Sequence, residues 1–188
     1  MFNTYSEVRG VAAAAGTAFN TFTTAKTVLP AGCLVTLEPN FWYVGRKAIV
    51  NVRGGLSNIV TTPGTITFQV MIGSIVVWTS GAVQLNATAH TLLPFWLRVD
   101  LTCRAVGATT TANLMGMGSL SGIMFTLTAA QVDAVNVPGM FPVPATAPAV
   151  GTGFDSTAAG TLDFWAGFSI SNIGNSIQIQ DYYVEFPN

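Results

Sequence analysis

The chain has 188 residues with seven Lys or Arg, eight Asp or Glu and a formal net charge of -1, so only 8% of it is charged. A soluble domain ordinarily carries about 25% charged residues, yet no Lys, Arg, Asp or Glu occurs between Gly54 and Leu97. Arg46, Lys47 and Arg53 form the only local basic group, which is too small for a nucleic-acid-binding surface. No apolar run approaches the roughly 20 residues of a membrane span. Such a composition favours a chain packed against other chains.

The first 30 residues show no sustained hydrophobic period and end at Pro30. We expect residues 1–30 to form an N-terminal arm, either laid over a neighbouring chain or disordered. Its aromatic side chains, Phe2, Tyr5, Phe19 and Phe22, are candidate partner-binding residues. Residues 31–188 are long enough for a single domain with its own core.

Alternation with a period of two predicts strands in most of that domain. In residues 93–104, Phe95, Leu97 and Val99 fall on one face of the strand, and Trp96 and Arg98 fall on the other. The same pattern predicts strands at 46–53, 65–72, 75–79, 82–86, 121–128, 162–170 and 176–186. Eight to ten short strands and no long helical pattern predict an all-β, antiparallel β-sandwich with a jelly-roll-like arrangement.

Two local features add detail to these strands. Gly73 and Ser74, between two apolar runs, are typical of a type II′ hairpin turn. In the last strand the apolar positions change phase near Asp181, which predicts a β-bulge there.

The segment 136–153 is charge-free and holds four prolines, so it should be an extended surface loop. The loop either packs on its own domain or contacts a partner. The second interpretation rests on Met140, Phe141 and Val143, which would otherwise be exposed.

Residues with catalytic or metal-binding chemistry are sparse. His90 is the only histidine, and a structural imidazole is the simplest interpretation of it. Asp155 and Asp163 are eight residues apart but match no calcium-loop pattern. Cys33 and Cys103 fit small buried hydrophobic residues, with a disulfide between them as the alternative. We therefore expect no enzyme, no bound metal and no cofactor.

Two glycine pairs, at 116–118 and 151–153, resemble fragments of a nucleotide-binding loop but lack the third glycine and the following helix. They are weak evidence for a nucleotide site.

The aromatic residues offer one binding hypothesis. Trp96 and Trp165 lie on the polar faces of their predicted strands. They could fill a subunit interface, or stack on sugar rings, and we favour the interface. Other aromatic residues that could join a stacking surface are Trp42, Trp78, Tyr43, Tyr182 and Tyr183.

Several motifs resemble structural proteins of tailed-bacteriophage virions. They are VLPAG at 28–32, GRKAIVNVRG at 45–54, GTITFQVMIG at 64–73 with WTSGAV at 78–83, LPFWLRVDLTCRAVG at 93–107, LDFWAG at 162–167 and IQIQDYY at 177–183. The resemblance covers about residues 28–128 and 160–186 and consists of turns and strand faces. It implies a β-sandwich module of a phage particle, and it carries over no catalytic residue.

From the low-charge composition and this resemblance together, we expect a capsid decoration or cement protein. It would lie on the exterior of a virion assembled in the cytoplasm of a bacterial host. Its partners would be the major capsid protein and further copies of itself, as a homotrimer or homodimer, with neither nucleic acid nor membrane involved. The alternative is the receptor- or glycan-binding head of a tail or head fibre, with a host-surface glycan as partner.

Overall fold

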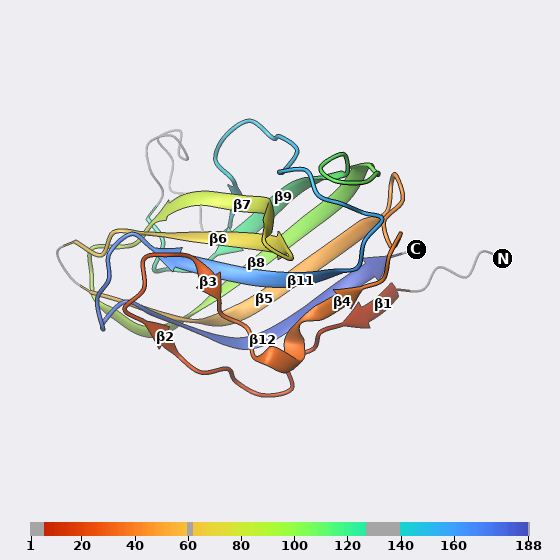
Figure 1. Ribbon diagram of the computed structural model, residues 1–188. Helices are drawn as coiled ribbons and strands as arrows, with labels where there is room; N and C mark the ends of the chain where they lie inside the picture. Colours follow the sequence, from red (N-terminus) through yellow and green to blue (C-terminus); the bar gives the residue numbers. More distant parts are fainter. Residues whose placement is uncertain (1–5, 60–61, 127–139, 188) are drawn as a thin grey trace.

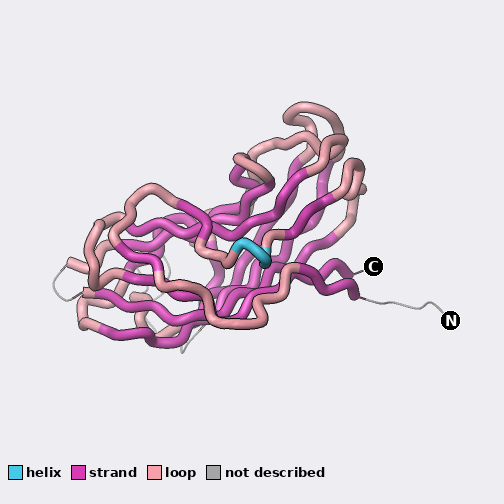
Figure 2. The backbone as a smooth tube through the Cα atoms, turned by 60° about the horizontal axis from the view of Figure 1, so that its bottom comes forward, coloured by secondary structure: helices cyan, strands magenta, loops and turns pink. Residues whose placement is uncertain are grey.

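Two antiparallel sheets pack face to face in the computed structural model, which describes residues 6–59, 62–126 and 140–187 (Figure 1). Sheet A contains β1 (Ser6–Arg9), β2 (Phe19–Asn20), β5 (Lys47–Asn58), β8 (His90–Ala105), β9 (Asn113–Ser121), β10 (Phe141–Val143) and β12 (Ser176–Pro187). Sheet B contains β3 (Lys26–Thr27), β4 (Val35–Leu37), β6 (Thr65–Ile72), β7 (Ile75–Gln84) and β11 (Gly160–Phe168). A single 3-10 turn, η1 (Ala31–Cys33), precedes β4. The all-β sandwich is confirmed, and Figure 2 shows how strands dominate the backbone.

The strand pairing is that of a jelly roll. Eight strands (β1, β4, β5, β6, β7, β8, β11 and β12) pair first with last, second with seventh, third with sixth and fourth with fifth. This nesting gives the two Greek keys of the fold. β9 and β10 extend sheet A beyond β8, so sheet A is the broader layer.

Alternating apolar residues on the facing surfaces of the sheets form the core. Phe68 of sheet B stacks on Phe95 of sheet A and on Phe164 of its neighbouring strand, with ring centroids 5.6 and 5.8 Å apart. All three rings are completely buried. Aromatic packing at these separations stabilises a sandwich beyond the burial of the ring area alone.

Most of the predicted strands are present, with two differences. The predicted strands 75–79 and 82–86 are one strand, β7, which stays continuous through bulges opposite β6. The predicted strand 121–128 is wrong: its residues 122–126 lie outside any strand, 127 and 128 lie outside the described residues, and the sheet is continued by β9 instead. The predicted hairpin turn is confirmed, because Ile72 pairs with Ile75 and Gly73 has a φ of +59°. The predicted bulge in β12 falls between Ile179 and Asp181.

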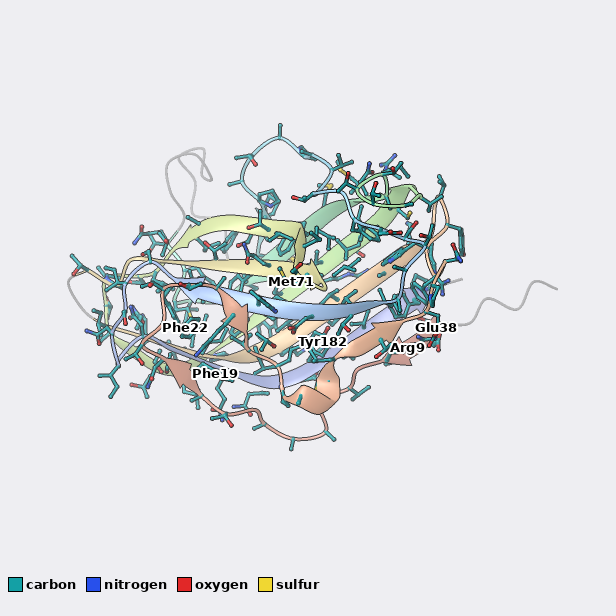
Figure 3. All side chains as sticks on the ribbon, in the orientation of Figure 1. Arg9, Phe19, Phe22, Glu38, Met71 and Tyr182 are labelled. Carbon is teal, nitrogen blue, oxygen red and sulfur yellow. The ribbon has the colours of Figure 1, made fainter. Side chains whose placement is uncertain are left out.

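The N-terminal segment belongs to the sandwich. β1 and β2 pair with β12, and β3 pairs with β11. Phe22 is buried and packs edge-on against Phe168 at 5.3 Å, near β2 and β3 (Figure 3). The expectation that residues 1–30 form an arm apart from the domain is therefore wrong for the described residues from Ser6 to Thr27, because these strands complete the edges of both sheets.

Part of the proline-rich segment also enters a sheet. Phe141 and Val143 are buried, while Pro142 lies between them on β10, the edge strand of sheet A. An edge strand tolerates proline because one of its sides makes no ladder hydrogen bonds. The expectation that Phe141 and Val143 would be exposed is wrong. Of the three predicted contact residues, Met140 alone is exposed. Residues 136–139 of the predicted loop lie outside the described residues.

Cys33 and Cys103 are both buried and both free. Burial raises the pKa of each thiol, as expected for small core residues. The described residues contain no helix with the length and apolar character needed to cross a bilayer.

A candidate binding groove on sheet A

The outer face of sheet A carries ordered rows of polar and aromatic side chains. The ladder places Asp181, Arg53, Trp96 and Ser121 side by side on β12, β5, β8 and β9. The next row holds Tyr183, Asn51, Arg98 and Ser119. The rows are two residues apart, or about 7 Å, because every second side chain of a strand points to the same face.

All residues of these two rows except Asp181 line an open groove of about 840 Å³. Trp96 is 53% exposed there, and Met140, which directly precedes β10, also lines the groove and is 63% exposed. Ligand pockets have volumes of about 300 to 1,000 Å³. The groove is therefore large enough for a small organic ligand.

Two ion pairs fix the arginines of the groove. Arg98 donates from Nε and Nη2 to the carboxylate of Asp100, with the closest N–O distance 2.9 Å. This hydrogen bonding raises the pKa of Arg98 above its usual value. Arg53 donates to Asp181 Oδ2 at 3.0 Å. Since these pairs are exposed, they contribute little to stability, but they orient both guanidinium groups on the outer face of sheet A.

The outer face of sheet B differs in character. Its rows are Trp165, Gln69 and Thr79, and then Gly167, Thr67 and Ala82, on β11, β6 and β7. Among the described residues that point out from these strands, Asp163 alone is charged.

Internal hydrogen bonds already occupy the Asp163 carboxylate. It accepts from Trp165 Nε1 at 2.6 Å and from Thr27 Oγ1 at 2.9 Å. The indole of Trp165 is therefore held against its own strand, and this face offers a ligand no free carboxylate.

The structure brings together two of the predicted site residues, Trp96 and Met140, in the groove. Trp165 lies on the other sheet, so the two tryptophans cannot form one stacking surface. Phe22, Phe141 and Val143 are buried in the core.

Phe19 is half-buried and packs against the core beneath the Lys26 ammonium, which lies 4.9 Å from its ring. Phe2 and Tyr5 lie outside the described residues.

Sequence reasoning missed the partners of Trp96. Arg53, Asn51 and Tyr183 lie on two other strands, and only the pairing of β5 with β8 and β12 brings them into the same groove as the indole. The available signal was the period-two alternation, which places each of them on an outward face. The alternation does not reveal the strand order that brings these faces together.

A constellation for metal binding is absent from the part of the chain that the structure describes. These residues contain no group of three or more His, Cys, Asp or Glu that could hold a metal ion. Asp155 accepts from Thr157 N at 2.8 Å and from its hydroxyl at 2.6 Å in a local turn, which lowers the Asp155 pKa. It therefore stabilises a loop and does not converge with Asp163.

The glycines at 116 and 118 serve packing. A Cβ on Gly116 would lie 2.3 Å from Cδ1 of Trp78, and one on Gly118 would lie 2.8 Å from Cζ2 of the same ring. The buried indole of Trp78 thus lies directly on the backbone of β9. The close packing of Trp78 therefore explains why glycines occur at these two positions, without a nucleotide-binding role.

No family model, curated protein or solved structure matches this chain.

Proposed function

We propose that this chain is a structural protein of a phage particle that attaches to the outer surface of the capsid and reinforces contacts between capsid subunits. The observation that carries the proposal is the outer face of sheet B, where Asp163 is the one charged side chain on β6, β7 and β11 and is bonded internally. The resemblance of the strand and turn motifs to virion proteins supports the same role.

An uncharged face loses little favourable hydration when it is covered. Thr67, Gln69 and Thr79 offer neutral hydroxyl and amide groups, and Trp165 adds a large apolar surface. Interfaces between proteins are depleted in charge at their centre and enriched in Trp. Repetition over a symmetric shell then strengthens a modest contact, because many copies act together.

The test places a charge at the centre of this face. Thr67→Lys should weaken attachment at least about tenfold, since an unpaired ammonium in a closed interface costs well over 1.4 kcal/mol. Ala82→Lys, at the exposed neighbouring position, should act the same way. Binding of the purified variants to particles that lack the protein is measured by co-sedimentation.

Met117→Lys is the matched control. Met117 is exposed on the outer face of sheet A opposite Asp100, so the new charge points away from the proposed interface and has a partner. Attachment of this variant should match the unmodified protein. Unchanged attachment of both sheet B variants, with unchanged melting temperatures, would contradict the proposal.

The groove supports a second candidate function, the receptor-binding head of a fibre. In that role the exposed Trp96 would contact a host-surface glycan. Particles without the protein would then fail to adsorb to cells while keeping a shell of normal stability, whereas loss of a cement protein would weaken the shell and leave adsorption intact.

A further inference from the structure

We infer that the groove around Trp96 is a binding site for a neutral saccharide. The inference concerns the outer face of sheet A and does not depend on how, or whether, sheet B attaches to a capsid.

Trp96 supplies the apolar contact that a sugar ring needs. The C–H groups on one face of a pyranose carry partial positive charge and pack on the negative π face of an indole. Trp96 is half exposed and lines the groove, and Met140 adds a flexible apolar side chain to the same lining. A tryptophan that only filled the core would be covered, as Trp42 and Trp78 are.

Polar groups next to the indole match the hydroxyls of a sugar. Ser121 borders Trp96 in its row, and Asn51 and Arg98 lie in the next row. Amide and hydroxyl groups both donate and accept hydrogen bonds, as sugar hydroxyls do. The Arg98–Asp100 pair presents fixed donors beside a carboxylate acceptor, which is the arrangement that two adjacent hydroxyls can bridge.

The charge balance of the groove favours a neutral ligand. Arg53 and Arg98 are each bound to a carboxylate, Asp181 and Asp100, at 3.0 and 2.9 Å. The two carboxylates neutralise the two guanidinium charges, so this pair of rows has no net positive charge to attract a sulfate, phosphate or sialic acid.

The experiment titrates the full-length protein with four probes: maltohexaose, cellohexaose, chitohexaose and, as the anionic comparison, sialyllactose. Binding is followed by tryptophan fluorescence and by calorimetry up to millimolar concentration. At least one neutral hexasaccharide should bind, and more tightly than sialyllactose.

Trp96→Ala should weaken that binding at least about tenfold, whereas Trp96→Phe should retain part of it because a ring remains. Trp165→Ala is the matched control, since it removes the same side chain from the opposite sheet, and it should bind as the unmodified protein does. A normal melting temperature for Trp96→Ala is expected, because its ring is half exposed.

Three outcomes would overturn the inference: no binding of any neutral probe, a preference for sialyllactose, or equal losses in Trp96→Ala and Trp165→Ala. Capture of a protein on this face, blocked by Trp96→Ala in the absence of saccharide binding, would instead identify the groove as a protein interface. None of these outcomes bears on Thr67→Lys, so failure here and failure of capsid attachment are separable.

Discussion

Tyr182 is the largest fully buried side chain of the core and lies between the two sheets (Figure 3). Its hydroxyl has no hydrogen-bond partner among the described residues. Burial raises the pKa of the phenol well above its ordinary value of about 10. The neutral phenol is thus tolerated in the core at a cost, and the phenolate is not.

Tyr182→Phe tests this description of the core. At neutral pH the variant should be about 1 kcal/mol more stable, since it removes an unpaired buried hydroxyl. Above a pH of about 10 the unfolded phenol ionises while the buried phenol stays protonated, so the unmodified protein loses about 1.4 kcal/mol of stability per pH unit there. Chemical unfolding between pH 7 and 11 should therefore show a steeper alkaline loss for the unmodified protein than for Tyr182→Phe. Parallel pH profiles would contradict the prediction. The two buried thiols contribute equally to the pH dependence of both proteins, so they do not affect the comparison.

At the scale of one residue, the alternation predicted which residues of the long strands face outward, but it did not predict their partners. The alternation placed Trp96 and Trp165 on outward faces, where they are. It gave no signal for the contact of Trp78 with Gly116 and Gly118, because glycine adds nothing to a hydrophobic pattern. For the same reason the alternation of β9 was hidden and a strand was expected at 121–128 instead.

At the scale of elements, the N-terminal strands are the clearest departure from expectation. β1, β2 and β3 are two to four residues long, and their pairing partners lie more than 130 residues away. Strands this short show no period of their own and form because β12 and β11 present open edges. Long strands such as β8, with 16 residues, carry enough alternation to be predicted alone.

Deleting residues 1–27 should therefore destabilise the domain. It removes three strands and the buried ring of Phe22, and loss of a buried Phe costs about 3–5 kcal/mol. For a chain of this size the melting temperature should fall by about 10 °C or more, or folding should fail. Thermal unfolding followed by circular dichroism gives the value. A deletion of residues 1–5, which leaves all three strands intact, is the control, and equal melting of the two deletions would show that the strands do not support the sandwich.

At the scale of the whole molecule, charge is divided between the two sheets. Arg53, Arg98, Asp100, Asp181 and Glu185 all lie on the outer rows of sheet A, while sheet B faces outward with one carboxylate that is internally bonded. The charge-free stretch from Gly54 to Leu97 accounts for much of this division, since it includes all of β6 and β7. Self-association into a dimer or trimer stays a prediction from the low charge alone.

Under the proposed capsid role, this division of charge predicts that sheet B lies against the shell and that the groove of sheet A faces out. Electron microscopy of phage particles assembled with this chain tests the proposed role most directly. We predict density for the sandwich at positions repeated over the capsid, with β6, β7 and β11 facing the shell. Density confined to the tail tip, or a shell contact made through the Trp96 groove, would contradict this account.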